Sequence, residues 1–214
     1  MSYVAIIDYG MGNLRSVAKA VEHVAPQGSV QVTSDAKVVE AAQRVIFPGQ
    51  GAMPDCMREL KARGLRDVVI EAARSKPFLG ICIGLQMLFD MSEEGDQSGL
   101  GLLAGKVVRF PADAHSASGE RLKVPHMGWN EVEQTRAHPL WQGIPNESRF
   151  YFVHSYYPVP ADETIIAGCT TYASRICCAV ARNSLFAVQF HPEKSQAAGL
   201  RLLNNFLIWD GSGK

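Results

Sequence analysis

The sequence lacks the features that would place a protein on nucleic acid, on a membrane or in an export pathway. Lysine plus arginine and aspartate plus glutamate both number 21, so the formal net charge is zero, and no basic stripe or acidic tail stands out. This balance argues against nucleic acid or a membrane surface as a partner. The longest apolar runs fall well short of a membrane span, and the opening MSYVAIIDYG reaches an aspartate too early for a signal peptide. We therefore expect a cytoplasmic protein.

Cysteine is scarce, and its spacing argues against two kinds of site. The five cysteines are an odd number, they form no CxxC pair, and Cys177 directly precedes Cys178. This pattern argues against a disulfide framework and against a zinc site, and it fits a reducing compartment. We expect no metal and no cofactor. The sequence also contains no long linker, internal repeat or low-complexity segment, so a single domain over residues 1–214 is expected.

The hydrophobic pattern changes near residue 123. Before it, short apolar runs at 4–7, 30–33 and 44–47 alternate with helical spacing at 14–22, 35–42, 53–63 and 65–74. After it, period-two runs follow one another at 123–130, 149–157, 164–169, 179–182 and 186–190. The polar stretch 113–120 predicts a flexible loop. We therefore expect an α/β fold, with a central sheet flanked by helices and an antiparallel β extension in the second half.

The stretch 76–90, KPFLGICIGLQMLFD, is the most informative part of the sequence. A buried strand is expected to turn sharply through residues 80–84 and continue as a helix over about 85–89. Gly80 and Gly84 flank Cys82, which is the thiol counterpart of a nucleophile elbow. The N-terminus of the following helix would favour the thiolate. A buried core cysteine between two packing glycines is the alternative.

Two glycine-containing turns follow earlier strands. The turn 48–51, PGQG, would leave backbone N–H groups free to face a developing oxyanion, with Gly51 as one donor and Ile83, the residue after the nucleophile, as the other. An ordinary strand-to-helix loop is an equally good interpretation of PGQG alone. The pair Gly10 and Gly12 favours a tight strand-to-helix connection over a nucleotide site.

A histidine near the end of the chain completes a catalytic pattern. His191 ends an expected strand and precedes Pro192, which holds the chain extended. Under strand alternation Glu193 lies on the same side as His191 and can orient its ring. Cys82, His191 and Glu193 then have the roles of nucleophile, base and orienting carboxylate. A single histidine is more often structural, but the elbow cysteine upstream favours the catalytic interpretation.

The segments GICIGLQ and QFHPEKS resemble the corresponding motifs of the class I (triad) glutamine amidotransferases, whose fold is flavodoxin-like. The resemblance implies hydrolysis of glutamine to glutamate and ammonia through a cysteinyl thioester. By matching positions, Gln86, Ser155 and Tyr156 would hold the glutamine substrate. Gln86 could instead be an exposed helix residue, and Ser155 and Tyr156 a sheet-edge pair.

The segments IIDYGMGN, VPHMGWN and YFVHSYY resemble the branch of that family that serves histidine biosynthesis. This resemblance implies a heterodimer in which ammonia passes to a cyclase subunit, a (β/α)8 barrel that makes imidazole glycerol phosphate and AICAR. Asn13, Met127, Trp129 and Lys194 are expected to contact the barrel, although core packing is an equally good interpretation of Trp129. Gln50 differs from the small aliphatic residue expected in many members, which leaves the resting orientation of its turn open.

Two other functions fit the same motifs. The protein could be the glutaminase subunit of another amidotransferase, serving anthranilate, aminodeoxychorismate or pyridoxal phosphate synthesis. It could also be a non-catalytic regulatory protein that retains the fold, although the intact Cys82, His191 and Glu193 argue against this.

Overall fold

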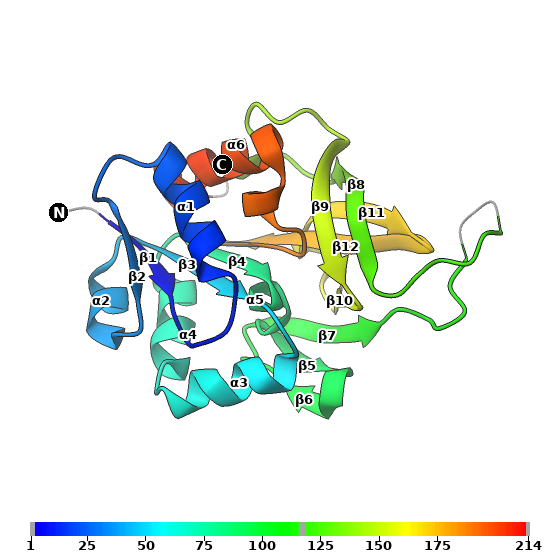
Figure 1. The fold of residues 1–214 in the computed structure, drawn as a ribbon, viewed down its shortest axis with the longest axis horizontal. Coiled ribbons are helices and arrows are strands. Elements are labelled where there is room, and N and C mark those ends of the chain that lie inside the picture. Colours follow the sequence, from blue (N-terminus) through cyan, green and yellow to red (C-terminus); the bar gives the residue numbers. More distant parts are fainter. Residues whose placement is uncertain (1–2, 116–118, 213–214) are drawn as a thin grey trace.

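The computed structural model describes residues 3–115 and 119–212, and its core is a nine-stranded sheet in the order β2-β1-β3-β4-β13-β12-β11-β8-β9 (Figure 1). A second sheet has the order β10-β7-β5-β6. The strands are β1 (Val4–Ile7), β2 (Val30–Thr33), β3 (Arg44–Gly49), β4 (Phe78–Cys82), β5 (Phe89–Ser92), β6 (Gln97–Ser98), β7 (Leu103–Arg109), β8 (His126–Gln134), β9 (Ser148–His154), β10 (Tyr156–Pro160), β11 (Ile166–Tyr172), β12 (Ser174–Arg182) and β13 (Leu185–Val188).

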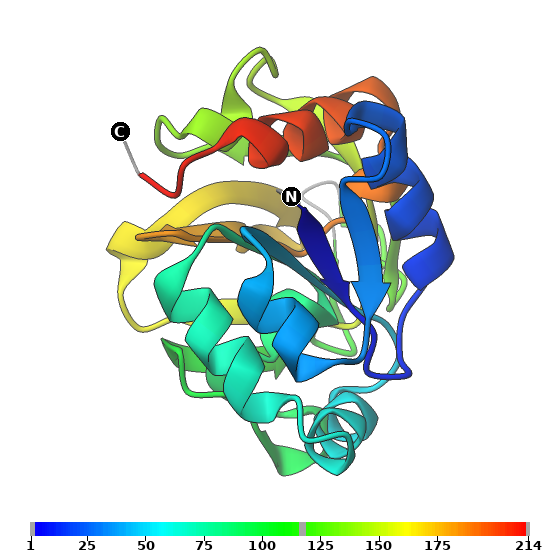
Figure 2. The same cartoon turned by 90° about the vertical axis from the view of Figure 1, so that its left-hand side faces the viewer.

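Helices cover both faces of the parallel half of the large sheet. They are α1 (Leu14–Val24), α2 (Ala36–Ala41), α3 (Met53–Ala62), α4 (Arg66–Ser75), α5 (Ile83–Gln86) and α6 (Gln196–Ile208), with 3-10 turns η1 (Glu94–Asp96), η2 (Pro139–Trp141), η3 (Glu163–Ile165) and η4 (Pro192–Lys194). Figure 2 shows α1 and α6 on one side of the sheet, with α2 and α4 on the other. Burial on both faces explains why β1, β4 and β13 consist of continuous apolar runs.

The parallel strands bring three separate parts of the sequence to one edge of the sheet. β3, β4 and β13 are neighbours and run in the same direction, with Gly49 opposite Cys82 and Val188 opposite Ile81. The turn after β3, the elbow after β4 and the segment after β13 therefore leave the sheet side by side. This edge is where ligands bind in open α/β sheets.

The expected fold class is confirmed, including the antiparallel extension formed by β12, β11, β8 and β9. Two expectations about local structure were wrong. The helix after the elbow ends at Gln86, and Phe89 begins β5 because the chain there pairs with β7. β13 was expected to belong to the antiparallel series alone. It pairs antiparallel with β12 along one edge, but its other edge pairs in parallel with β4. The sequence pattern also gave no prediction for α6.

Asn13 occupies the cap position of α1 without a side-chain hydrogen bond, whereas Asp35 caps α2 by accepting from the Lys37 N–H. Within the loop expected over 113–120, His115 forms an isolated bridge with Arg121, and residues 116–118 lie outside the described residues. Among the helices of the described chain, none has the length and apolar character needed to cross a membrane.

All five cysteines are free and buried. Cys82 lies at the end of β4, and Cys56 lies on α3. The other three lie in the extension, where Cys169 on β11 pairs directly with Cys177 on β12 and Cys178 follows. The cysteines are thus divided between the parallel half and the antiparallel extension.

Candidate active site

Cys82 occupies a strained backbone position between β4 and α5. Its φ is +57° and its ψ −112°, a combination that side chains rarely adopt. Packing explains the flanking glycines: a Cβ at Gly84 would lie 1.9 Å from the Phe47 carbonyl oxygen, and one at Gly80 would lie 3.0 Å from the Cβ of Ala187. The two glycines let β3 and β13 approach the elbow closely, and the elbow geometry expected from the sequence is present.

His191 and Glu193 form a buried pair beside the elbow. The imidazole Nδ1 lies 2.8 Å from Glu193 Oε1, and the two side chains are only 4% and 1% exposed. The contact arises through the 3-10 turn η4, in which the Lys194 N–H donates to the His191 carbonyl. Strand alternation was therefore the wrong reason for a contact that the structure does contain.

The electrostatic environment of His191 favours its protonated form. Burial alone would lower the pKa of the imidazole, but the negative charge of a Cys82 thiolate, a hydrogen bond to that sulfur and the Glu193 carboxylate outweigh it and raise the pKa to about 10. His191 Nε2 has no hydrogen-bond partner of ordinary geometry within the described chain. Its contact with the Cys82 sulfur is therefore looser than a regular hydrogen bond. The two groups can share one proton as a thiolate–imidazolium pair.

A cavity of about 330 Å³ opens over these groups. Its wall contains most of the side chains and backbone expected at the site, namely Gly51, Cys82, Ile83, Gln86, Ser155, Tyr156 and His191. Glu193 stands behind His191. Gly51 and Ile83 thus line the cavity, and donation from their backbone N–H groups to a substrate oxygen stays a prediction.

In the PGQG turn, close contacts explain Gly49 and the backbone conformation explains Gly51. A Cβ at Gly49 would lie 2.7 Å from the Tyr9 hydroxyl and 2.8 Å from the Gly84 nitrogen, and Gly51 has φ +106°. The Cys56 thiol donates to the Gln50 carbonyl oxygen, with 3.5 Å between sulfur and oxygen. Gln50 itself is exposed and lines the cavity, so solvent leaves room for its longer side chain.

Gln86 is a buried residue of the site, which excludes the alternative of an exposed helix position. Its Nε2 donates to the Tyr156 carbonyl at 3.1 Å and to Gln189 Oε1 at 3.0 Å. Its Oε1 is buried at the cavity without a hydrogen-bond partner in the described chain. A buried acceptor without a partner costs free energy, so this oxygen is well suited to accept an N–H from a substrate.

Two polar residues of the site were missed by the sequence analysis. Gln189 is fully buried, and its Nε2 donates to Cys82 Sγ at 3.7 Å. It stands two positions before His191, and that spacing along an extended chain was a usable signal. His154 lines the cavity and is the last residue of β9. Nothing in the local sequence distinguished it from a structural histidine.

His154 and His126 form a neutral, buried pair. His126 Nδ1 lies 2.9 Å from His154 Nε2, and His154 Nδ1 lies 2.8 Å from the Tyr156 carbonyl oxygen. Burial lowers the pKa of His126 to about 4 and that of His154 to about 3. Two aromatic rings pack against the pair: Tyr172 stacks on His126 at 3.9 Å between ring centroids, and the Phe110 ring centroid lies 5.2 Å from that of His154.

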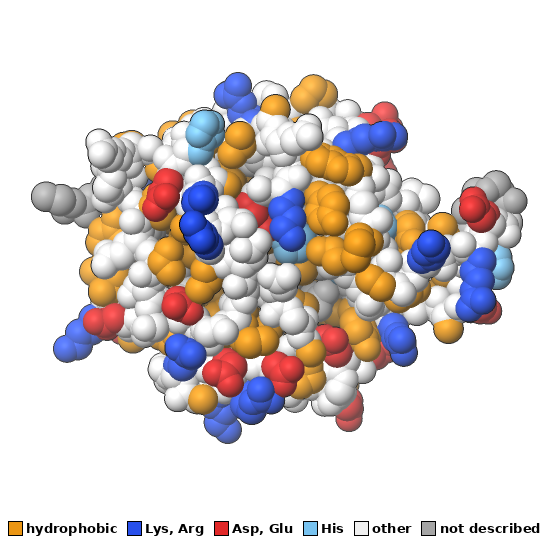
Figure 3. All heavy atoms as spheres, viewed as in Figure 1, with side chains coloured by type: hydrophobic (Ala, Val, Ile, Leu, Met, Phe, Trp, Pro, Cys, Tyr) orange, Lys and Arg blue, Asp and Glu red, His pale blue; other side chains and the backbone are white. Residues whose placement is uncertain are grey.

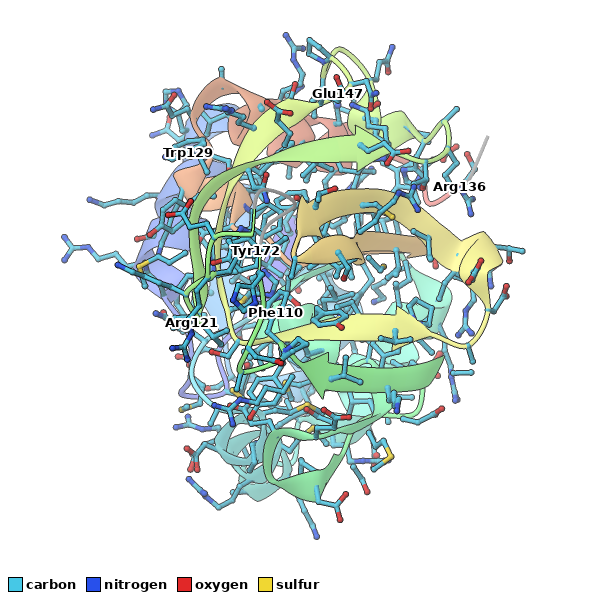
Figure 4. All side chains as sticks on the ribbon, turned by 90° about the vertical axis from the view of Figure 1, so that its right-hand side faces the viewer. Phe110, Arg121, Trp129, Arg136, Glu147 and Tyr172 are labelled. Carbon is cyan, nitrogen blue, oxygen red and sulfur yellow. The ribbon has the colours of Figure 1, made fainter. Side chains whose placement is uncertain are left out.

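An apolar patch lies on β8 and β9 near the cavity, and we define it as Met127, Trp129 and Tyr151. Met127 is 61% exposed and Trp129 is 43% exposed, so Trp129 is not a core residue. The rings of Trp129 and Tyr151 are 6.1 Å apart, and Lys194 Nζ lies 5.7 Å from the centre of Tyr151. Figure 3 shows hydrophobic side chains gathered over these strands, and Figure 4 shows Trp129 standing apart from Phe110 and Tyr172.

Known proteins resemble the chain over almost its whole length. The family "Glutamine amidotransferase class-I" matches residues 5–209. A protein of Aromatoleum aromaticum named "Imidazole glycerol phosphate synthase subunit HisH" is 68% identical over 210 residues, which is 98% of this chain and 99% of that one. The protein of the same name in Nitrosospira multiformis is 63% identical with the same coverage.

Solved structures agree in fold. A "Crystal structure of glutamine amidotransferase" superimposes with a TM-score of 0.71 at 18% identity, covering 96% of this chain and 97% of the other. The "Structure of PurLQS from Thermotoga maritima" gives the same TM-score, identity and coverage. At this identity the likeness is one of fold alone.

Proposed function

The chain belongs to the class-I glutamine amidotransferases, and from that premise we propose that it is the glutaminase subunit of imidazole glycerol phosphate synthase. It hydrolyses glutamine to glutamate and ammonia, and the ammonia serves histidine biosynthesis. Relatives that are 56–68% identical bear this subunit's name, which favours this pathway over anthranilate, aminodeoxychorismate or pyridoxal phosphate synthesis. The observation that carries the catalytic part is the buried His191–Glu193 pair beside the strained elbow cysteine.

We assign the first chemical step to Cys82. Its thiolate attacks the side-chain carboxamide carbon of glutamine, and the carbonyl π electrons move onto oxygen to give a tetrahedral oxyanion. The N–H groups of Gly51 and Ile83 are assigned to that oxygen, and each such donor is worth roughly 3 kcal/mol of transition-state stabilisation. His191 holds the thiol proton as an imidazolium, and Glu193 Oε1 stabilises that charge at 2.8 Å.

The second step releases ammonia. The His191 imidazolium gives its proton to the leaving amide nitrogen, the C–N bond breaks, and a γ-glutamyl thioester remains on Cys82. Neutral His191 then takes a proton from water, whose oxygen attacks the thioester carbonyl. Collapse of this intermediate breaks the C–S bond, which yields glutamate and restores the thiolate–imidazolium pair.

Substrate recognition is assigned to Gln86, Ser155 and Tyr156 at the cavity wall. The Gln86 Oε1 atom is without a partner in the described chain and needs a donor, so a substrate with an N–H group satisfies it. Glutamine has such donors in its carboxamide and its ammonium group. Gln86 Nε2 meanwhile donates to the Tyr156 carbonyl, which ties the amide to the segment that follows β9.

The proposed partner is the cyclase subunit of imidazole glycerol phosphate synthase, a (β/α)8 barrel with which the chain forms a heterodimer. The apolar patch fits such an interface, since exposed aromatic side chains are typical anchors. Asn13 and Lys194 are assigned to the same surface. Docking beside the cavity would pass ammonia to the cyclase, which makes imidazole glycerol phosphate and AICAR, before water protonates it.

The test is a glutaminase assay with and without the purified cyclase and its nucleotide substrate. We expect slow hydrolysis by the isolated subunit and a rise when the liganded cyclase is added, because a glycine-flanked turn can change conformation on docking. Equal rates under both conditions would remove the activation. Co-purification with a chorismate-binding enzyme instead of a barrel cyclase would redirect the assignment.

A further inference from the structure

Gln189 lies against the nucleophile in a position that the mechanism above does not use. Its side chain is fully buried, its Nε2 is 3.7 Å from Cys82 Sγ, and its own backbone N–H donates to the Cys178 carbonyl at 2.8 Å. The residue directly follows β13, whose partner in the sheet is the elbow strand β4. The backbone of Gln189 is therefore held by the sheet, and its side-chain amide lies within hydrogen-bond distance of the sulfur.

The orientation of this amide is determined by its neighbours. The backbone carbonyl of Tyr156 can only accept, so the Gln86 atom that contacts it must be Nε2. The same Nε2 donates to Gln189, so the Gln189 atom in that contact must be Oε1. The remaining atom of the Gln189 amide, which faces Cys82, is therefore the N–H donor.

The histidine pair anchors the same chain of hydrogen bonds. His154 Nδ1 donates to the Tyr156 carbonyl, and its Nε2 consequently accepts from His126 Nδ1. His126 Nε2 faces the Asn130 amide at 3.4 Å. The polarity of every bond from Asn130 to the sulfur thus follows from the Tyr156 carbonyl and from neutral histidines. An amide held in this way is pre-organised and cannot rotate to present its oxygen to the sulfur.

We propose that Gln189 is a catalytic residue of glutamine hydrolysis, whose side-chain N–H stabilises the Cys82 thiolate. The inference rests on the proposed function and adds a residue to it. A hydrogen bond to a charged acceptor is about twice as strong as one to a neutral acceptor, so this donor favours the thiolate over the thiol.

The other groups near Cys82 differ from Gln189 in their protonation state or their charge. Burial raises the pKa of Tyr9 well above its ordinary value and that of Cys56 to about 11, so both are neutral near pH 7. Glu94, from η1, lines the cavity and carries a like charge. His191, backed by Glu193, supplies the positive charge. Gln189 supplies a neutral N–H donor, with its Nε2 3.7 Å from the sulfur.

The experiment compares the full chain in complex with the cyclase, as wild type and as Gln189→Met, which has a similar volume and no N–H. The rate of Cys82 alkylation by iodoacetamide is followed from pH 5 to 10 by mass mapping of the Cys82 peptide, together with kcat and KM for glutamine. We expect the alkylation midpoint to move up by about one pH unit and kcat to fall about tenfold, with a small change in KM.

Two further variants keep the inference falsifiable. Gln189→Glu keeps the shape and replaces the donor by a carboxylate, so we expect a larger upward shift of the midpoint. Gln134→Met, a half-buried amide that donates to the Ile144 carbonyl, controls for the loss of an amide elsewhere. An unchanged alkylation profile in Gln189→Met, or in Gln189→Glu if the first variant does not fold, would overturn the role. If instead the wild-type complex does not hydrolyse glutamine, the proposed function fails, and the alkylation profiles still decide the role of Gln189.

Discussion

Gly49 and Cys82 lie opposite each other in register on the neighbouring parallel strands β3 and β4. The candidate oxyanion turn and the nucleophile therefore leave the sheet at the same level. No loop has to fold back to bring them together. The close approach needs glycine at position 49, where a Cβ would meet the Tyr9 hydroxyl and the Gly84 nitrogen at under 3 Å.

The strained backbone of Cys82 gives a stability prediction. Both Cys82→Ala and Cys82→Gly remove the sulfur and should abolish glutamine-dependent activity, while activity with added ammonium survives in the cyclase complex. Glycine adopts φ +57° freely, whereas alanine keeps the Cβ penalty. We expect the Gly variant to be more stable than the Ala variant by about 1 kcal/mol in urea unfolding, the reverse of the usual order. A less stable Gly variant would show that the elbow is not strained.

The loss of stability on replacing each elbow glycine by alanine should depend on the space around that glycine. At Gly84 a Cβ would lie 1.9 Å from a backbone oxygen, and backbone cannot yield cheaply. At Gly80 the nearest atoms are the Ala187 methyl group at 3.0 Å and the Gly84 carbonyl oxygen at 3.1 Å, so a shift of a few tenths of an ångström relieves the contact. We expect Gly84→Ala to cost about 3 kcal/mol or more and Gly80→Ala about 1 kcal/mol, as measured by chemical denaturation. Equal costs would contradict the tight contact of the elbow with β3.

The Glu193 carboxylate should set the upper pH limit of activity. It is one of the groups that raise the pKa of His191, after the larger contribution of Cys82. Glu193→Gln keeps the shape and removes the charge, so the imidazolium should lose its proton at lower pH. We expect the alkaline limb of the kcat/KM profile to move to lower pH and kcat to fall about a hundredfold. A lower kcat with an unmoved alkaline limb would assign Glu193 a purely structural role.

Buried neutral histidines should make the fold acid-sensitive. Burial lowers the pKa of His138 and His126 to about 4 and that of His154 to about 3, below the ordinary 6.5. Between these values the unfolded chain binds protons at these positions that the folded chain does not, so the contribution of the three histidines to the unfolding free energy is largest above pH 6.5 and falls as pH drops toward 4.

The variant His138→Asn tests this sign, since asparagine can still accept from the Leu140 N–H and does not titrate. We expect lower stability at pH 7 and a shallower loss between pH 6.5 and 4, measured by urea unfolding at several pH values. His23→Asn, on an exposed face of α1, controls for removal of a histidine. An unchanged slope in His138→Asn would show that His138 is not charged on unfolding.

The apolar patch should carry the affinity for the cyclase. Trp129 is exposed and contacts Tyr151 edge-on, as a typical interface anchor does. We expect Trp129→Ala to weaken the complex by about 30-fold or more in calorimetry. The alkylation rate of Cys82 in the isolated subunit should not change. Ile208→Ala, which truncates an exposed apolar residue on α6, is the control and should bind normally.

Local chemistry determined how much could be predicted. The elbow, the PGQG turn and the His191–Glu193 contact were visible because each lies within a few residues of sequence. Gln189 and His154 were missed: the spacing of Gln189 from His191 was a local signal, but the contacts of both residues depend on the pairing of β13 with β4 and on the carbonyl of Tyr156. The helix after the elbow was predicted, but its early end was missed for a similar reason: Phe89 suits a helix locally, but its pairing with β7 takes precedence.

The positions of the cysteines allow the unfolding of two parts of the chain to be followed separately. Cys56 and Cys82 belong to the parallel half, whereas Cys169, Cys177 and Cys178 lie together on β11 and β12. Native-state thiol labelling in increasing urea would therefore time the opening of each half separately. Coincident protection would establish one cooperative unit over residues 1–214, and staggered labelling would divide the chain at β13.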